Sequence, residues 1–170
     1  MSQDTKACLE QAIRMEKDGK EFYARAASNA TSPAVRMIFE ELARQEEYHI
    51  KKIGEIFALV EKSQAMNEWI TCVIGDSTFD FLFGDKAVVE AGASGSDIDA
   101  LGLALEIEEK SVKYYDDLAD RAQDKYEKRF YLALCQEERG HYLRIMDSIE
   151  MLSNPEGWNY VKGRGMVDGG

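Results

Sequence analysis

Six residues of this chain have the types and the spacing of metal ligands. They are four glutamates and two histidines: Glu16, Glu46, His49, Glu108, Glu138 and His141. The chain has only two histidines, and each stands three residues after a glutamate. A Glu-x-x-His spacing puts both side chains on one face of a helix, where both can reach one metal ion. Four carboxylates nearly neutralise two divalent cations, so the set predicts a pair of metal ions.

The second half of the chain repeats the first. When the sequence is shifted by 92 residues, the distance from Glu16 to Glu108, the two halves align without a gap, and each Glu-x-x-His falls on the other. Identical residues also align along the rest of the repeat: Leu9 with Leu101, Ala12 with Ala104, Tyr23 with Tyr115, Leu42 with Leu134, and Ile53 with Ile145. Each half therefore predicts one helical hairpin.

Apolar residues at steps of three and four predict four helices in these hairpins. The expected ranges are about 5–30, 33–64, 97–122 and 125–153. Ser32 before Pro33 is typical of a helix N-cap, and Ser96 followed by Asp97 resembles a second one. The six candidate ligands lie on the inner, apolar seams of these helices. A carboxylate there is costly unless it is paired or protonated, so a pair of divalent cations is the simplest shared partner.

The fold class that follows is all-α, with two hairpins in a ferritin-like four-helix bundle. Residues of about 66–96 would form a long crossover between the hairpins. A flexible linker between separate domains is the alternative, but aromatic residues such as Trp69, Phe79 and Phe81 argue against it. We expect one domain over residues 1–152 and a glycine-rich C-terminal tail over 153–170.

Composition excludes several classes of protein. The chain has 170 residues and a formal net charge of -11, which disfavours nucleic acid as a partner. Most of that excess is explained by a solvated acidic surface. Its three cysteines are scattered, and its N-terminus lacks the pattern of a signal peptide. No apolar segment reaches the roughly 18 residues that span a membrane. We therefore expect a cytoplasmic protein with reduced thiols and no membrane contact.

With these motifs established, the chain resembles a rubrerythrin-type member of the ferritin-like superfamily over about residues 5–152. The residues that carry the resemblance are Glu16 with Tyr23, Glu46-x-x-His49, Glu108 with Tyr115, and Glu138-x-x-His141. The resemblance implies a di-iron centre in which Glu46 and Glu138 bridge the two ions. One glutamate and one histidine then complete each site, Glu16 with His49 and Glu108 with His141.

Two tyrosines follow the outer glutamates by two helical turns. Tyr23 and Tyr115 lie on the same faces as Glu16 and Glu108. They could hydrogen-bond the carboxylates of the ligands. Equally, they could be core aromatics whose hydroxyl groups bond elsewhere.

The chain departs from the family pattern in two ways. It contains no Cys-x-x-Cys pair of the kind that forms a rubredoxin module, and it has no additional acid one turn from Glu108. The positions in those turns are Ala104, Leu105, Ser111 and Val112. The resemblance implies a di-iron oxidoreductase that oxidises Fe(II) with peroxide or O₂ and needs an electron donor. We expect no catalytic residue beyond the metal ligands and no organic cofactor.

Two points stay open beside that interpretation. The alternative function is a ferritin-like protein that binds iron, zinc or manganese without turnover, since these ions share ligand types. Assembly is the second point. The aromatic residues expected in the crossover would offer an apolar surface, so we expect a homodimer.

Overall fold

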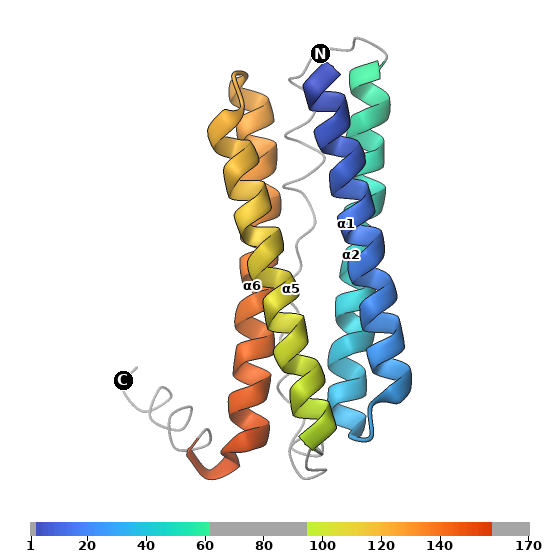
Figure 1. Ribbon diagram of the computed structural model, residues 1–170, viewed down its shortest axis with the longest axis vertical. Coiled ribbons are helices and arrows are strands. Elements are labelled where there is room, and N and C mark those ends of the chain that lie inside the picture. The colour runs from blue at the N-terminus through green and yellow to red at the C-terminus, as the bar shows by residue number, and fades with distance from the viewer. Residues whose placement is uncertain (1–2, 62–94, 158–170) are drawn as a thin grey trace, which may run out of the picture.

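The computed structural model describes residues 3–61 and 95–157, which form an all-α four-helix bundle (Figure 1). Its helices are α1 (Gln3–Asn29), α2 (Pro33–Glu61), α5 (Gly95–Arg121) and α6 (Lys125–Ser153). The predicted fold class is confirmed, and the described residues contain no strand. The expected crossover lies outside the described residues except at its last two positions, which belong to α5. Most of the expected C-terminal tail also lies outside them.

Each half of the sequence repeat forms one antiparallel hairpin. Helix α1 packs along α2, and α5 packs along α6, whereas the contacts of α1 with α5 and of α2 with α6 are smaller. Figure 1 shows the two hairpins side by side with their helices nearly aligned. Equivalent residues of the repeat therefore face each other across the interior of the bundle.

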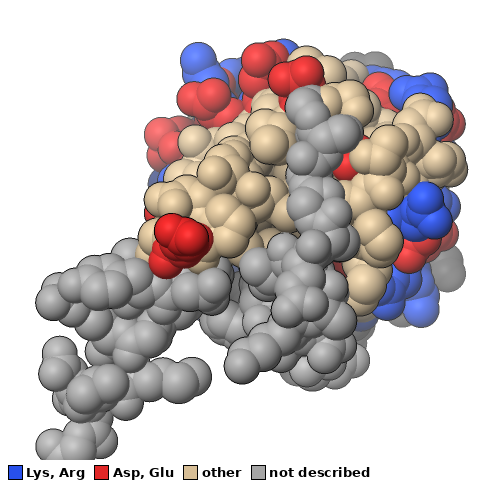
Figure 2. Space-filling view, turned by 90° about the horizontal axis from the view of Figure 1, so that it is seen from below, with Lys and Arg blue, Asp and Glu red and all other residues tan. Residues whose placement is uncertain are grey.

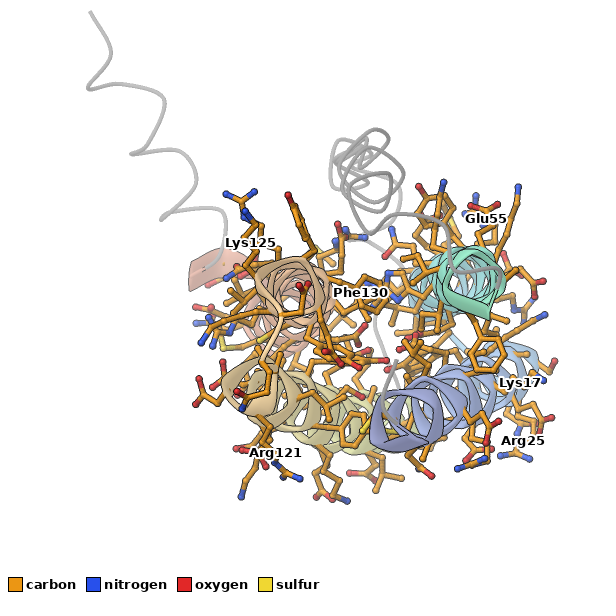
Figure 3. All side chains as sticks on the ribbon, turned by 90° about the horizontal axis from the view of Figure 1, so that it is seen from above. Lys17, Arg25, Glu55, Arg121, Lys125 and Phe130 are labelled. Carbon is orange, nitrogen blue, oxygen red and sulfur yellow. The ribbon has the colours of Figure 1, made fainter. Side chains whose placement is uncertain are left out.

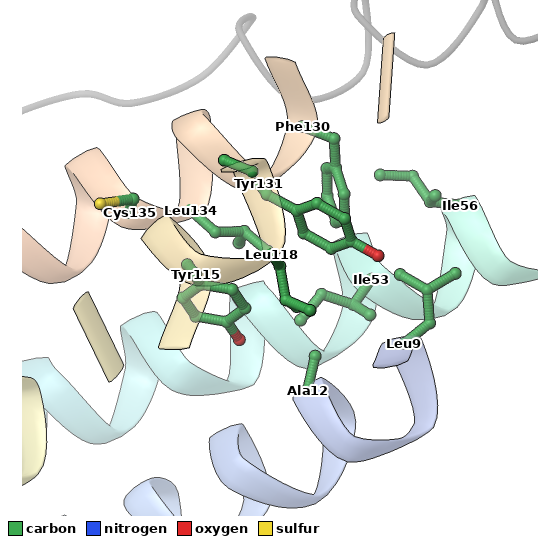
Figure 4. Close-up of a cluster of buried hydrophobic side chains, with 11 residues drawn as sticks. Leu9, Ala12, Ile53, Ile56, Tyr115, Leu118, Phe130, Tyr131, Leu134 and Cys135 are labelled. Atoms are coloured by element: carbon green, nitrogen blue, oxygen red, sulfur yellow. The ribbon is translucent and has the colours of Figure 1, made fainter. Parts of the chain in front are cut away.

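The interior contains two apolar clusters, one toward each end of the bundle. The first includes Leu9, Ile53 and Leu118 and is drawn in Figure 4. The second includes Phe39, Leu42 and Leu101. Burial of this apolar surface is the main force that holds the hairpins together. The candidate ligands lie between the clusters along each helix.

Charged side chains cover the outside of the bundle. Viewed down its axis, the labelled charged residues lie around the rim, whereas Phe130 points between helices (Figure 3). Seen from below, uncharged residues occupy much of the visible end of the bundle, and acids and bases lie around its edge (Figure 2). None of the described helices is apolar over a stretch long enough to cross a membrane.

Asp97 links the two hairpins at one end of the bundle. It lies in the first turn of α5 and is buried. Its carboxylate accepts hydrogen bonds from the backbone nitrogen atoms of Thr31 and Ser32, at 3.0 and 2.9 Å, and from the Thr31 hydroxyl at 2.7 Å. These groups belong to the turn between α1 and α2. Asp97 therefore satisfies backbone donors at the start of a helix in the other hairpin.

Of the two predicted serine caps, Ser32 stands at the expected position directly before α2, which begins at Pro33, whereas Ser96 does not precede α5. The backbone carbonyl of Ser32 accepts from the nitrogen of Arg36 at 3.0 Å, as expected at a helix start. Its buried hydroxyl, however, has no hydrogen-bond partner among the described residues, so the side chain of Ser32 does not cap the helix. Ser96 lies inside the first turn of α5, which begins at Gly95. The side chain that caps α6 is Asp124, which accepts hydrogen bonds from the backbone nitrogen atoms of Tyr126 and Glu127.

Candidate metal centre

The six predicted ligands come together in the middle of the bundle. One glutamate comes from α1 and one from α5, and each of α2 and α6 supplies a Glu-x-x-His pair. Each of the six residues is at most 4% exposed. Helical periodicity explains the burial, because these positions continue the same inner seams as Leu9, Leu42 and Leu134.

The ligand atoms fall into two overlapping groups. One group is Glu16, Glu46, His49 and Glu138, and the other is Glu46, Glu108, Glu138 and His141. Within each group, one potential ligand atom of every residue lies within 4.8 Å of the others. Glu46 and Glu138 are the members common to both groups. The remaining members are one glutamate and one histidine on each side.

Both histidines present Nδ1 to several carboxylates. His49 Nδ1 lies 3.0 Å from Glu16 Oε2, 3.2 Å from Glu138 Oε1 and 3.5 Å from Glu46 Oε2. His141 Nδ1 lies 3.4 Å from Glu108 Oε1 and 3.6 Å from oxygen atoms of Glu46 and Glu138. The two imidazole rings stack, with centroids 5.3 Å apart and planes at 13°. Each imidazole therefore faces a ring of oxygen ligands.

Several atoms of the cluster lack hydrogen-bond partners within the described part of the chain. They are Oε2 of Glu108, Oε1 of Glu138 and Nδ1 of His141. A buried polar atom left without a partner costs about 1–3 kcal/mol, so native proteins rarely keep one without a reason. Carboxylate oxygen and imidazole nitrogen are also ligands that first-row transition metals accept. These atoms therefore fit a divalent cation that would satisfy them.

The metal-free carboxylates repel one another. Burial, followed by the nearby charge of Glu138, raises the pKa of Glu46 well above its usual value. Burial is also the largest cause that raises the pKa of Glu108 to about 7, although the neighbouring His141 opposes it. Without a metal, both groups therefore tend to hold a proton at neutral pH.

The histidines and Glu138 are shifted so that each favours its charged form. Burial alone would lower the pKa of each histidine, but the surrounding carboxylates outweigh burial and raise it, led by Glu138 for His49 and by the charge of Glu108 for His141. Burial likewise opposes ionisation of Glu138, but His141 and His49 outweigh it and lower the pKa of Glu138. Protonated imidazoles thus occupy the cationic role that a metal would otherwise have.

Both predicted tyrosines contact the cluster, and each contacts the opposite hairpin. The Tyr23 hydroxyl in α1 donates to Glu108 Oε1 in α5, and the Tyr115 hydroxyl in α5 donates to Glu16 Oε1 in α1. Both side chains are fully buried. Burial and the nearby carboxylates raise the pKa of each phenol, so both remain protonated donors. The sequence left open whether these hydroxyl groups bond the carboxylates or other groups. In the structure they donate to the carboxylates of Glu108 and Glu16.

The neighbouring turns differ between the two halves. Gly19 lies one turn after Glu16, and its equivalent in the repeat is Ser111. A Cβ atom at Gly19 would lie 3.6 Å from Cδ and Oε1 of Glu46, which is ordinary contact. The close approach of Gly19 to Glu46 was not predicted from the sequence. The sequence signal that could have indicated this approach is a glycine in the interior of a long helix, where glycine costs about 1 kcal/mol relative to alanine.

Comparisons with known proteins agree with this picture. Residues 7–79 match the family model described as Rubrerythrin. The fold is similar to that of the hypothetical protein Pfu-1136390-001 from Pyrococcus furiosus, with a TM-score of 0.63 over 89% of this chain and 91% of that one. The two sequences are 21% identical, so this likeness concerns the fold alone. No curated protein matches the chain.

Proposed function

We propose that the buried cluster is a di-iron centre and the protein a non-haem di-iron oxidoreductase, as the match of residues 7–79 to the Rubrerythrin family model suggests. The observation that carries the proposal is the overlap of two ligand groups on Glu46 and Glu138. In the proposal these two glutamates are shared by both ions. Each ion is completed by one glutamate and one histidine, Glu16 with His49 and Glu108 with His141.

The residues around the cluster support redox chemistry with a small oxidant. When bound, two ferrous ions supply the two electrons that, with two protons, reduce hydrogen peroxide to two water molecules. Burial keeps bulk water from the carboxylates, which strengthens their electrostatic interactions. Tyr23 and Tyr115 orient the carboxylates of Glu108 and Glu16 by donating hydrogen bonds to them. We propose peroxide or O₂ as the oxidant of Fe(II).

A stopped-flow experiment tests this function. The protein is loaded with Fe(II) without oxygen and mixed with hydrogen peroxide. Loss of about one peroxide for every two ions, together with the rise of ferric absorption, is the expected result. Glu138→Ala should greatly reduce both signals. Glu137→Ala is the matched control, because it removes the adjacent carboxylate, which belongs to neither ligand group. A loaded parent protein that reacts with neither peroxide nor O₂ would contradict the proposal.

A second candidate function is metal binding without turnover. It is favoured by the absence of any Cys-x-x-Cys pair in these 170 residues, since such a pair would help to hold an electron-transfer iron. Zinc or manganese would suit the same donors. Elemental analysis of protein purified without oxygen from its own host tests this candidate. Zinc or manganese supports binding without turnover, whereas iron requires the stopped-flow result to separate the two functions.

A further inference from the structure

The outer face of α6 carries apolar side chains that the bundle leaves in solvent. Leu143 is 54% exposed, Met146 41% and Leu132 38%. They lie in one row that steps by four and three residues along the helix. The row, which we call the α6 outer row, is Leu132, Gln136, Arg139, Leu143, Met146 and Glu150. This alternation is the spacing of a helix seam that packs against another helix.

The repeat shows that the fold does not require these apolar side chains. The same positions in α2, offset by 92 residues, are Glu40, Arg44, Glu47, Lys51, Gly54 and Ala58. Thus α2 has Glu40, Lys51 and Gly54 where α6 has Leu132, Leu143 and Met146. Each of the two is the second helix of its own hairpin, and both bury the equivalent inner seam. Helix α2 exposes Met37 and Tyr48 at other positions, but it has no large apolar side chain in this row. The apolar side chains of α6 therefore mark a candidate contact surface.

We propose that the α6 outer row binds the α6 outer row of a second copy of this chain, antiparallel about a two-fold axis. In this register Leu143 packs on Met146 of the partner subunit, and the symmetry repeats that contact. The same register brings Arg139 opposite Glu150 of the partner subunit. The reason is that residues 143 and 146 have the same midpoint along α6 as residues 139 and 150, and the two-fold axis passes through that midpoint. An apolar centre is then flanked on both sides by an ion pair.

Charge selects this arrangement over its alternatives. A parallel pairing in register would put Arg139 against Arg139 and Glu150 against Glu150, which repel. Within the protomer, the guanidinium of Arg139 lies 4.0 Å from the carboxylate of Asp116, and both side chains are about half exposed. Such an ion pair is worth little, so the guanidinium can turn to a partner at small cost. The chain is strongly acidic, so two copies need a local attraction of this kind to approach.

The interface is small, and its strength follows from its size. Two apolar side chains and one ion pair from each protomer predict a dissociation constant on the order of micromolar. Sedimentation velocity between about 1 and 100 µM should therefore show a reversible monomer–dimer equilibrium. Leu143→Glu should raise the dissociation constant at least tenfold, because it places two acids at the apolar centre. The matched control is Lys51→Glu at the equivalent position of α2, which should leave the equilibrium unchanged.

A charge exchange tests the register. Arg139→Glu alone and Glu150→Arg alone should each weaken the dimer, since each sets like charges opposite one another. Arg139→Glu combined with Glu150→Arg restores opposite charges in the proposed register and should recover most of the parent association. Thermal unfolding of every variant checks that the protomer remains folded.

Three outcomes would overturn the proposal. One is a parent protein that stays monomeric at 100 µM. Another is a Leu143→Glu variant that dimerises like the parent, which would assign the interface to another face. The third is a Leu143→Glu variant that lowers the melting temperature without changing the association, which would mean that the protein's own chain covers the row. None of these measurements involves the metal, so the proposed function stands or falls separately.

Discussion

The Tyr23 hydroxyl in α1 donates a hydrogen bond to the Glu108 carboxylate in α5, across the boundary between the two hairpins. Tyr115 in α5 makes the reciprocal bond to Glu16 in α1. Each hairpin thus orients a carboxylate of the other. The contact between α1 and α5 is otherwise small. At the same level of the bundle, His49 with Glu138 and His141 with Glu46 make the corresponding contacts between α2 and α6.

Removing one tyrosine hydroxyl should weaken metal binding on one side of the centre. Tyr23→Phe removes the donor to Glu108, and Tyr115→Phe removes the donor to Glu16. Each should lower the affinity for one ion about 10- to 100-fold, the usual effect of losing a partner of a ligand. Titration calorimetry with Fe(II) under nitrogen measures the two affinities. Tyr114→Phe is the control, since its hydroxyl donates to the backbone of Cys8. Equal affinities in all three variants would contradict the orienting role.

Replacing a shared glutamate should be worse than replacing an unshared one. Glu46→Ala or Glu138→Ala should reduce occupancy of both metal positions, because each belongs to both ligand groups. Glu16→Ala should mainly weaken the position shared with His49. The ratio of metal to protein after gel filtration measures occupancy, and Glu47→Ala serves as the exposed control. If all three ligand variants bound metal like the parent, these acids would not be ligands.

Chelation should lower stability without unfolding the bundle. Metal that binds only the folded state adds about 2.7 kcal/mol per site at a hundredfold excess over its dissociation constant. For two sites in a chain of this length, removal should lower the melting temperature by roughly 10 to 20 °C. Circular dichroism should still show helix, because the two apolar clusters on either side of the site remain packed. Loss of the helical signal at 25 °C would contradict this expectation.

The metal-free protein should become less stable as the pH rises through neutrality. The pKa of Glu108 is raised to about 7 and that of Glu46 is also raised, so their stabilising protons are present below about pH 4.5 and are lost as the pH rises. For Glu108 alone the loss is on the order of 3 kcal/mol. The histidines, whose pKa values are raised, change stability in the same direction.

Glu138 has the opposite dependence at low pH. Its pKa is lowered well below the usual 4.5, so its contribution is fully present above about pH 4.5 and is lost as the pH falls through that lowered pKa. Urea unfolding of the metal-free protein should therefore show a maximum of stability near pH 5. Metal affinity should rise with pH instead, because an ion must displace these protons. Metal-free stability that increased steadily from pH 5 to pH 8 would contradict the assignment.

Gly19 should be sensitive to size, and Gly54 should not. A Cβ at Gly19 already contacts the Glu46 carboxylate, so the larger side chain of Gly19→Leu must displace it. Metal affinity should fall by tenfold or more. Gly54→Leu is the matched control, since a Cβ there meets no atom within 4 Å. Replacing this glycine in a helix should leave metal binding unchanged and stabilise the helix slightly. Equal metal affinities for the two variants would show that Glu46 adapts freely.

Much of the architecture could be predicted from the sequence because it rests on local periodicity. Apolar steps of three and four residues indicated the helices, and the repeat between Glu16 and Glu108 indicated two equivalent hairpins. Two histidines, each three residues after a glutamate on an inner seam, indicated one buried cluster. Burial forces such positions to the centre of a bundle whatever the details of its packing.

The tertiary structure decided which residues meet across the hairpins. From spacing alone, Tyr23 lies on the face of Glu16, yet its hydroxyl reaches Glu108. Likewise, Asp97 looked like part of a cap on its own helix, but it bonds the turn before α2. Periodicity specifies a face of one helix, whereas these partners depend on how far two helices are shifted along each other. That shift is set by the packing of both hairpins together, which no single segment of sequence contains.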